Sequence, residues 1–362
     1  MRANTRGMAE HTLDLGLARD ETLARLWRAA AQGLPIPTEC FAHSPSSKFV
    51  HKLQHVAAWN NHGPTAVALC EQTPDDDDEQ VKAWILAQAA FHGSVDAAAA
   101  LIAAGINVHA EVDLGGGKAL HWAVRGGHVS AVAFLINAKA DIEFPGWIRD
   151  SPIHRLAKGG DAVVQTLLSA KVDVNRADRD GATPIHWAAK TGDAAIVLQL
   201  LHAKANVKAT DHSGNTALHW GAGCASVVRV LLAAKVDVEA VNYWGRQAVH
   251  DAALGGQVRA VARLIKAKAA MHAVQDGSGR TALHLAVAAG KHVAVAAFLV
   301  AAKSDVNHVD HAGQTPLLTA VQNNAADDIV QLLVDAKARV EKSAMVHAFG
   351  RVERYTYTRF GV

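Results

Sequence analysis

Residues 178–210 read DRDGATPIHWAAKTGDAAIVLQLLHAKANVKAT, and this stretch decides the fold. Its first four residues have the composition of a tight turn, in which Asp favours the start and Gly the end. Thr183 is a good helix N-cap, and Pro184 is tolerated at the first helical position. Gly192 and Asp193 then interrupt that helix. A second helix is indicated by apolar residues at helical spacing, namely Val197, Leu200 and Leu201.

A short box inside this stretch, residues 184–188, returns along the chain. Its histidine, or the residue in the same place, lies at positions 121, 154, 186, 219, 250, 284 and 318, so that successive boxes are 31 to 34 residues apart. Leu318 replaces the histidine in the last box. A fixed period of this size indicates a stacked repeat protein.

The repeating unit resembles the ankyrin repeat in its turn, its Thr-Pro-Ile-His box and its two short helices. The resemblance covers residues 80–343. It implies an all-α fold, an α-solenoid of about eight stacked repeats, each a turn plus two antiparallel helices, with a concave groove that binds other proteins. The expected repeats span about 80–111, 113–145, 146–177, 178–210, 211–241, 242–274, 275–309 and 310–343. The spacing also predicts a shortened helix junction at Gly223-Cys224 and one extra residue near Gly290.

The ends of the chain depart from the period. Residues 1–47 are expected to form an N-terminal extension with one amphipathic helix over about 21–32. Residues 48–79 are interpreted as a degenerate capping repeat and an acidic linker, with a plain helical hairpin as the alternative. Residues 344–362 form a short C-terminal tail, which either caps the last repeat or is flexible.

Composition limits the possible functions of the 362-residue chain. A net charge of only +2 argues against a dedicated nucleic-acid or membrane surface. The three cysteines are widely spaced, which argues against a disulfide framework and predicts a reducing compartment, namely the cytoplasm, with the nucleus as the alternative. No signal peptide is evident, and the apolar residues 84–106 are interrupted by polar ones, which favours a helix pair over a membrane span.

The sequence offers no catalytic or cofactor motif. It contains no phosphate-binding loop, no His-Glu-x-x-His and no Cys-x-x-Cys. The box histidines are structural in the ankyrin family, where they tie each turn to its neighbour, so we expect no metal site and no cofactor. We therefore expect a protein that is not an enzyme and that is a monomer by itself.

A binding surface has better support. By resemblance, the residue after the box histidine faces the groove. In the first four boxes of this chain, that residue is tryptophan three times and arginine once. Both residue types are enriched at interface hot spots. Large side chains also lie at the predicted turn tips. The candidate partner-binding residues are Trp122, Arg125, Arg155, Trp187, Lys190, Trp220, Tyr243, Trp244, His212 and Arg179. The alternative for the three box tryptophans is that their rings pack against the neighbouring repeat.

One departure from the family recurs after the second helix, where a left-handed glycine is usual. This chain has lysine there in seven repeats, at Lys139, Lys171, Lys204, Lys235, Lys268, Lys303 and Lys337. A non-glycine residue at positive φ costs on the order of 1 kcal/mol. Either the recurring lysines have no binding role, or they form a row that docks an acidic partner.

The sequence therefore predicts a non-catalytic adaptor that binds a protein partner through its groove and turn tips. Two alternatives remain open at this point. The chain could be a structural subunit of a large assembly that orders its irregular ends, or a regulatory or targeting subunit of an enzyme complex.

Overall fold

The computed structural model describes residues 61, 63–70, 78–112, 117–144, 152–270, 273–275 and 277–339. The expected helix over 21–32, the extension that contains it and the tail 344–362 lie outside these residues, and so does most of the 48–79 segment. The chain divides into two compact units, residues 1–173 and 174–362, and each is described by itself.

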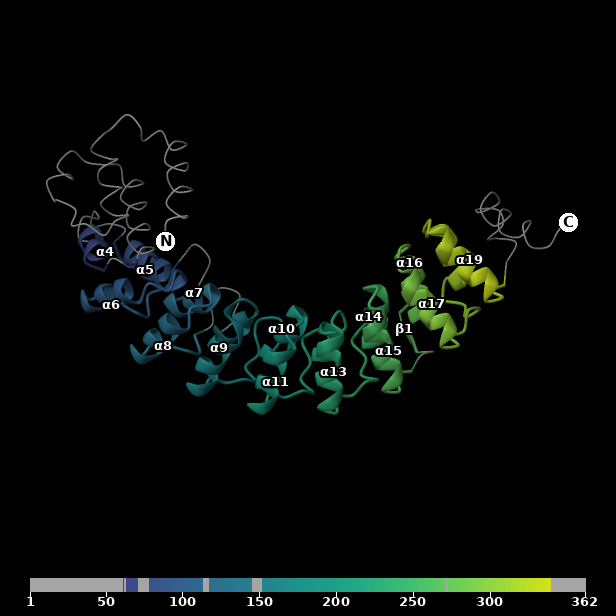
Figure 1. Ribbon diagram of the computed structural model, residues 1–362, viewed down its shortest axis with the longest axis horizontal. Helices are drawn as coiled ribbons and strands as arrows, with labels where there is room; N and C mark the ends of the chain where they lie inside the picture. The colour runs from purple at the N-terminus through teal and green to yellow at the C-terminus, as the bar shows by residue number, and fades with distance from the viewer. Residues whose placement is uncertain are drawn as a thin grey trace, which may run out of the picture. The chain divides into compact units, whose positions relative to one another are not determined.

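Unit 1 contains short helices in pairs (Figure 1). In chain order they are α4 (Gly63–Cys70), α5 (Asp78–Phe91), α6 (Val95–Ala103), α7 (Ala119–Gly126), α8 (Val129–Asn137), the 3-10 helix η3 (Pro152–Arg155) and α9 (Leu156–Ser169). Helix α9 is broken at Gly160, whose φ of 71° and ψ of 169° are not helical, so that it supplies the end of one helix and the whole of the next.

Unit 2 continues the same pattern (Figure 1). Its helices are α10 (Pro184–Thr191), α11 (Ala194–His202), α12 (Ala217–Trp220), α13 (Ala225–Ala233), α14 (Ala248–Leu254), α15 (Val258–Lys266), α16 (Ala282–Ala288), α17 (Val293–Ala301), α18 (Pro316–Gln322) and α19 (Asp327–Asp335). One small hairpin joins β1 (Val274–Gln275) to β2 (Arg280–Thr281), paired antiparallel.

The helices of each unit lie in two layers. In unit 2 the first helices α10, α12, α14, α16 and α18 pack in succession, and the second helices α11, α13, α15, α17 and α19 pack in a parallel succession. In unit 1, α5 packs against α7, while α4, α6 and α8 form the second-helix layer. The layers meet over buried apolar side chains, for example Ile185, Ala188, Val197 and Leu200. The fold is thus an all-α repeat solenoid, as predicted.

The two irregular spacings appear where the sequence places them. Helix α12 has four residues, whereas α10 has eight, and residues 221–223 form a turn that leads to α13. A side chain at Gly221 would approach Val227 Cγ1 to 2.6 Å, so the shortened junction depends on glycine there. In the repeat near Gly290 the extra residue lies between α16 and α17.

The lysines that follow the second helices adopt the left-handed conformation. All seven have φ between 58° and 70°, which confirms the prediction from the missing glycine. At Lys204 the backbone N–H donates to the Leu201 carbonyl at 3.0 Å, and the next N–H, of Ala205, donates to Leu200 at 2.9 Å. These two bonds close the end of the helix in the manner of a Schellman motif.

Helix α4 is the described part of the segment interpreted as a degenerate repeat. It packs against α6, as neighbouring second helices do elsewhere in the unit. Asn61 takes the left-handed position before it (φ 61°), and its side chain bonds both Asp96 and the N–H of Ala97. Both features resemble a second helix of the repeat, while the first half of the segment lies outside the described residues.

Candidate functional site

The box histidines position the first helices. In α10, the N–H of Thr183 donates to Nδ1 of His186 at 3.1 Å, so this nitrogen is an acceptor. The proton then lies on Nε2, which is 3.1 Å from the Asn215 carbonyl of the next turn and donates to it. His219 bonds the Arg246 carbonyl in the same way, and His250 bonds Ala273. The histidines tie each turn to its neighbour, as the resemblance implied.

Burial favours the neutral form of three box histidines. Desolvation lowers the pKa of His186, His250 and His284, although the backbone carbonyl that each ring contacts favours protonation. A protonated ring could not accept the N–H bond at Nδ1, which adds to the same preference. These histidines are therefore fixed structural links, and they are not arranged for proton transfer.

In α10, α12 and α14 the residue after the box histidine is partly exposed, and we call the surface formed by these three helices the first-helix face. At its centre, Trp187 and Trp220 are both half-buried. Their rings meet edge to face, with centroids 5.3 Å apart and planes at 72°. This geometry is the preferred one for aromatic pairs. The sequence left open whether these rings pack or face solvent, and the structure shows that they do both.

Two aspartates from the preceding turns orient the indoles. Oδ2 of Asp178 accepts a hydrogen bond from Trp187 Nε1 at 2.7 Å, and Oδ2 of Asp211 accepts one from Trp220 Nε1 at 2.9 Å. The other oxygen of each aspartate closes its turn, in Asp178 by accepting the N–H groups of residues 180 and 182. One side chain thus fixes both the turn and the ring, which limits the rotation of each indole.

Asp211 is ionised in this setting. Burial opposes its charge, but hydrogen bonds from Asn215, Trp220 and Ser213 outweigh burial and hold the pKa of the carboxyl below its usual value. Asn215 donates through both its backbone N–H (2.8 Å) and its side-chain amide (2.9 Å). The sequence analysis did not identify Asp178 or Asp211. The signal was present, since each aspartate precedes its tryptophan by nine residues.

Lys190 lies over the tryptophan pair. Its Nζ is 5.0 Å from the centroid of the Trp187 ring and 4.9 Å from that of Trp220. The side chain is exposed, and it forms no ion pair with any residue that the structure describes. The face therefore presents two indoles, one from α10 and one from α12, with an ammonium group about 5 Å from both rings.

The pattern changes at the next repeat. Asn242 replaces the turn aspartate, and Asp251 replaces the tryptophan. Asn242 still closes its turn, and its side-chain amide donates to Asn215 at 2.7 Å. Burial raises the pKa of Asp251, against the influence of His219 and of Arg246, whose Nη1 is 3.8 Å away. In this repeat the turn aspartate and the tryptophan are thus both replaced.

The turn tips form a second exposed group. Tyr243 is 80% exposed and Trp244 is 52% exposed, which confirms the expectation that both face solvent. Arg179 and His212 are exposed as well. Successive tips are joined through the backbone, because the N–H of His212 donates to Asp180 at 2.8 Å and that of Tyr243 donates to Ser213 at 3.0 Å. Each ring covers the glycine of the previous tip, where a Cβ atom would clash.

The candidate residues of unit 1 are placed differently. Trp122 packs against a small buried cluster of Ala83, Ala87 and Val112, and its ring lies edge to face with Phe91 at 6.0 Å. One side of the Trp122 ring is therefore packed against neighbouring side chains, as the alternative in the sequence analysis has it. The Arg125 guanidinium is 5.4 Å from the same ring. Arg155 lies in η3, and its side chain is outside the described part of the chain.

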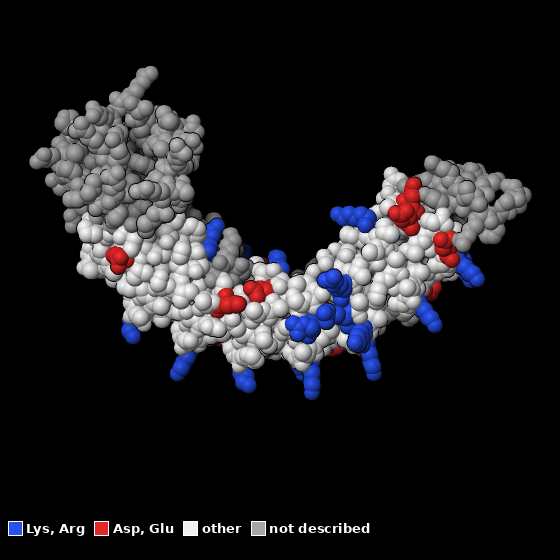
Figure 2. Space-filling model, viewed as in Figure 1, with Lys and Arg blue, Asp and Glu red and all other residues white. Residues whose placement is uncertain are grey.

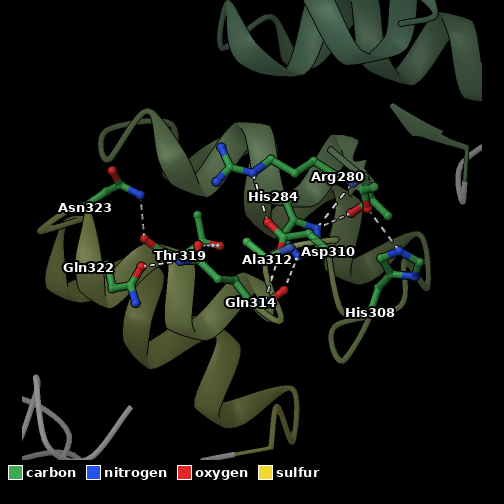
Figure 3. A network of polar contacts seen from close by, with 11 residues as sticks. Arg280, His284, His308, Asp310, Ala312, Gln314, Thr319, Gln322 and Asn323 are labelled. Atoms are coloured by element: carbon green, nitrogen blue, oxygen red, sulfur yellow. Dashed lines mark hydrogen bonds and ion pairs between the residues drawn. The ribbon is translucent and has the colours of Figure 1, made fainter. Parts of the chain in front are cut away.

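The C-terminal repeats carry a polar network in place of the aromatic pair (Figure 3). Arg280 Nε donates to Asp310 Oδ2 at 3.0 Å, and His284 Nε2 contacts the Gln314 carbonyl at 3.1 Å. The Gln314 side-chain amide donates to Gln322 at 2.6 Å. The residues that correspond to Trp187 are Leu285 and Thr319, and both are buried, at 5% and 0% exposure.

The described residues show neither a metal site nor a membrane-spanning helix. No three His, Cys, Asp or Glu side chains within them are grouped so that they could hold a metal ion. None of the described helices has both the length and the apolar character needed to cross a bilayer.

Comparison with protein families identifies the repeat. The family profile described as "Ankyrin repeats (3 copies)" matches residues 54–145, 153–242 and 249–344. The chain belongs to the ankyrin repeat family. The first match begins at residue 54, so it includes α4 and most of the segment 48–79. Ankyrin repeats are generally protein–protein interaction modules. A comparison with curated proteins gave no match.

Proposed function

We propose that this ankyrin repeat protein is a non-catalytic adaptor that binds a protein partner through its first-helix face, centred on Trp187 and Trp220. The observation that carries the proposal is the half-exposed indole pair, oriented by Asp178 and Asp211. Lys190 adds a positive charge directly above the two rings.

The pair has the properties of a binding hot spot. Tryptophan is enriched among interface residues whose truncation costs about 2 kcal/mol or more. Each indole already has a partner for its N–H, so binding need not leave a polar group unpaired. Because both rings are held in place before contact, a partner that covers them loses little additional side-chain entropy. The exposed faces of the rings gain most from being covered by an apolar or acidic side chain.

The turn tips extend this surface within unit 2. Tyr243 and Trp244 expose large aromatic area next to the repeat that carries Trp220. Isolated exposed apolar residues are common on protein surfaces, but two adjacent aromatics on an ordered turn are typical of contact sites. We therefore assign the tips, together with Arg179 and His212, to the rim of the same interface.

The two alternative functions lack a comparable observation. A structural subunit or an enzyme-targeting subunit would be recognised by ends that its neighbours order. Most of residues 1–79 and all of 344–362 lie outside the described residues. The adaptor proposal is preferred because it rests on a site within the described part of the chain.

The test is affinity capture of the tagged full chain from its own cell extract, with Trp187→Ala/Trp220→Ala beside the wild type. We expect the double variant to lose at least 90% of one set of captured proteins, since two hot-spot losses of about 2 kcal/mol each would weaken binding far more than tenfold. Trp122→Ala is the matched control, because it removes the same residue type from the same box position in unit 1.

Two outcomes would contradict the proposal. An unchanged set of captured proteins would show that the face is not the site. A loss that accompanies a collapse of the far-UV circular dichroism signal would show that the rings are needed for folding, so the signal must be measured for each variant. We expect the Trp122→Ala chain to keep the partner.

A further inference from the structure

The second-helix layer of unit 2 carries a concentration of positive charge. On α15, Arg259, Arg263 and Lys266 are exposed at positions i, i+4 and i+7, so they form one stripe of the helix. Arg229 is exposed on α13, which packs against α15. The lysines that end these two helices extend the stripe. We call the six residues the α15 basic patch: Arg229, Lys235, Arg259, Arg263, Lys266 and Lys268. Figure 2 shows blue side chains gathered over α13 and α15.

The patch is not neutralised from within. None of its six cations forms an ion pair with a residue that the structure describes. The nearest acids in the sequence, Asp237 and Glu239, follow α13, and the Asp237 carboxylate accepts the N–H of Glu239. Like charges one helical turn apart repel each other and destabilise a helix. The end of the helix dipole favours Arg263 and Lys266 in the last turn of α15, but no described acidic side chain pairs with the stripe.

The patch also has clear limits. The neighbouring second helices α11 and α17 contain no Lys or Arg, and α19 carries Asp327, Asp328 and Asp335 instead. The stripe on α15 is about 10 Å long at 1.5 Å per residue, and packed helices are about 8–10 Å apart. The length of the patch thus matches the length of a few residues of extended chain, at about 3.3 Å per residue. A membrane or a nucleic acid is matched better by a longer basic surface.

We propose that the α15 basic patch binds an acidic peptide segment of a partner protein. The carboxylates of that segment pair with the guanidinium groups of α15, and arginine suits this role because it can bind a carboxylate through two parallel hydrogen bonds. The patch lies on second helices, whereas the tryptophan pair lies on first helices, so the inference does not depend on the proposed function. It differs as well from the lysine row, since four of the six cations are outside that row.

The experiment measures binding of a fluorescein-labelled peptide with six consecutive Asp or Glu residues to the full chain, by fluorescence anisotropy at low salt. We expect Arg259→Gln/Arg263→Gln/Lys266→Gln to weaken binding about tenfold or more, and we expect wild-type binding to weaken as salt is raised. The control is Lys204→Gln/Lys303→Gln/Lys337→Gln, which removes the same charge from exposed positions outside the patch and should change the affinity less than twofold.

The outcomes separate the alternatives. An equal loss in both triple variants would assign the binding to net charge or to the lysine row and would overturn the proposal. Anionic phosphatidylserine vesicles and a single-stranded oligonucleotide are tested in parallel. If either binds the wild type more tightly than the peptide and is lost with the α15 variant, the patch serves a membrane or a nucleic acid and not an acidic protein segment. Circular dichroism of each variant checks that it is folded.

Discussion

Two regions of unit 2 treat the same box position in opposite ways. In residues 178–222, the residue after the box histidine is Trp187 or Trp220, half-buried and next to solvent. In residues 275–323, the equivalent positions hold Leu285 and Thr319, which are 5% and 0% exposed. The box histidines, the turn and the helix pair are common to both regions. The comparison shows that the same position of one repeat framework can hold either a partly exposed ring or an additional core side chain.

The turn aspartate follows the same division. Asp211 accepts the N–H of an indole that faces outward, whereas Asp310 accepts Arg280 Nε at 3.0 Å within the network of Figure 3. Both carboxylates close their turns with the other oxygen. In the region with tryptophans, the turn aspartate therefore orients a solvent-facing ring. In the C-terminal region, it bonds an arginine of the preceding repeat.

The largest effect is expected where the position is core. Leu285→Ala should lower the free energy of unfolding by about 2–4 kcal/mol, because it leaves a cavity at a buried site. Trp187→Ala removes a larger side chain but should cost less, about 1–2 kcal/mol, since its ring is half-exposed and relies on one hydrogen bond and one ring contact. Urea unfolding of both variants gives the comparison.

This order of effects is the reverse of side-chain size. If Trp187→Ala destabilises the chain as much as Leu285→Ala, the indole is core and the division between the two regions disappears.

Both regions contain box histidines, and the pH dependence of stability tests the histidines of both regions together. The pKa of His186, His250 and His284 lies below the usual 6.5 in the folded chain. Below about pH 6.5 the unfolded chain binds protons that the folded chain does not, so stability is complete above this pH and falls as the pH is lowered. We expect the urea midpoint to decrease from pH 7.5 to pH 5.

Single variants locate this dependence. His186→Gln in one region and His284→Gln in the other should each flatten the pH profile by a similar amount. A profile that is level in the wild type between pH 7.5 and 5 would show that the histidines do not act as described. A change in only one variant would mean that the boxes of the two regions differ in protonation.

Asp211→Asn and Asp310→Asn distinguish the two regions by tryptophan emission, with a smaller loss of stability than Leu285→Ala. An amide at this position places an NH₂ group near Asn215 or the Trp220 N–H, so one donor loses its acceptor at a cost of about 1–2 kcal/mol. The tryptophan emission spectrum should shift, because the indole loses its carboxylate partner. Asp310→Asn has a similar cost through Arg280 but should leave the emission unchanged. A shift in both variants, or in neither, would contradict the assignment of Asp211 to the indole.

Much of the fold could be predicted from the sequence, since its determinants are local. The turn, the Thr-Pro start and the glycine break all lie within residues 178–193, and the period repeats them. The candidate binding surface is only partly predictable. The Asp178–Trp187 bond joins residues nine apart, which meet only when the turn has folded back on the helix. Nor does the box show that Thr319 is buried, because the same box position is half-exposed at Trp187.

Replacement of the left-handed lysines is expected to change the free energy of unfolding least, and it serves as a control on the comparison of the two regions. Lys204 follows a helix of the tryptophan region and Lys303 one of the C-terminal region, with φ of 70° and 66°. Since glycine adopts this conformation without steric cost, Lys204→Gly and Lys303→Gly should each raise the free energy of unfolding by about 0.5–1 kcal/mol, less what the positive charge contributes at the helix end. The equality of the two gains matters more than their size. Both lysines close a nine-residue second helix through the same pair of backbone hydrogen bonds. An unequal gain measured by urea unfolding would therefore mean that the difference between the regions extends beyond the first-helix face.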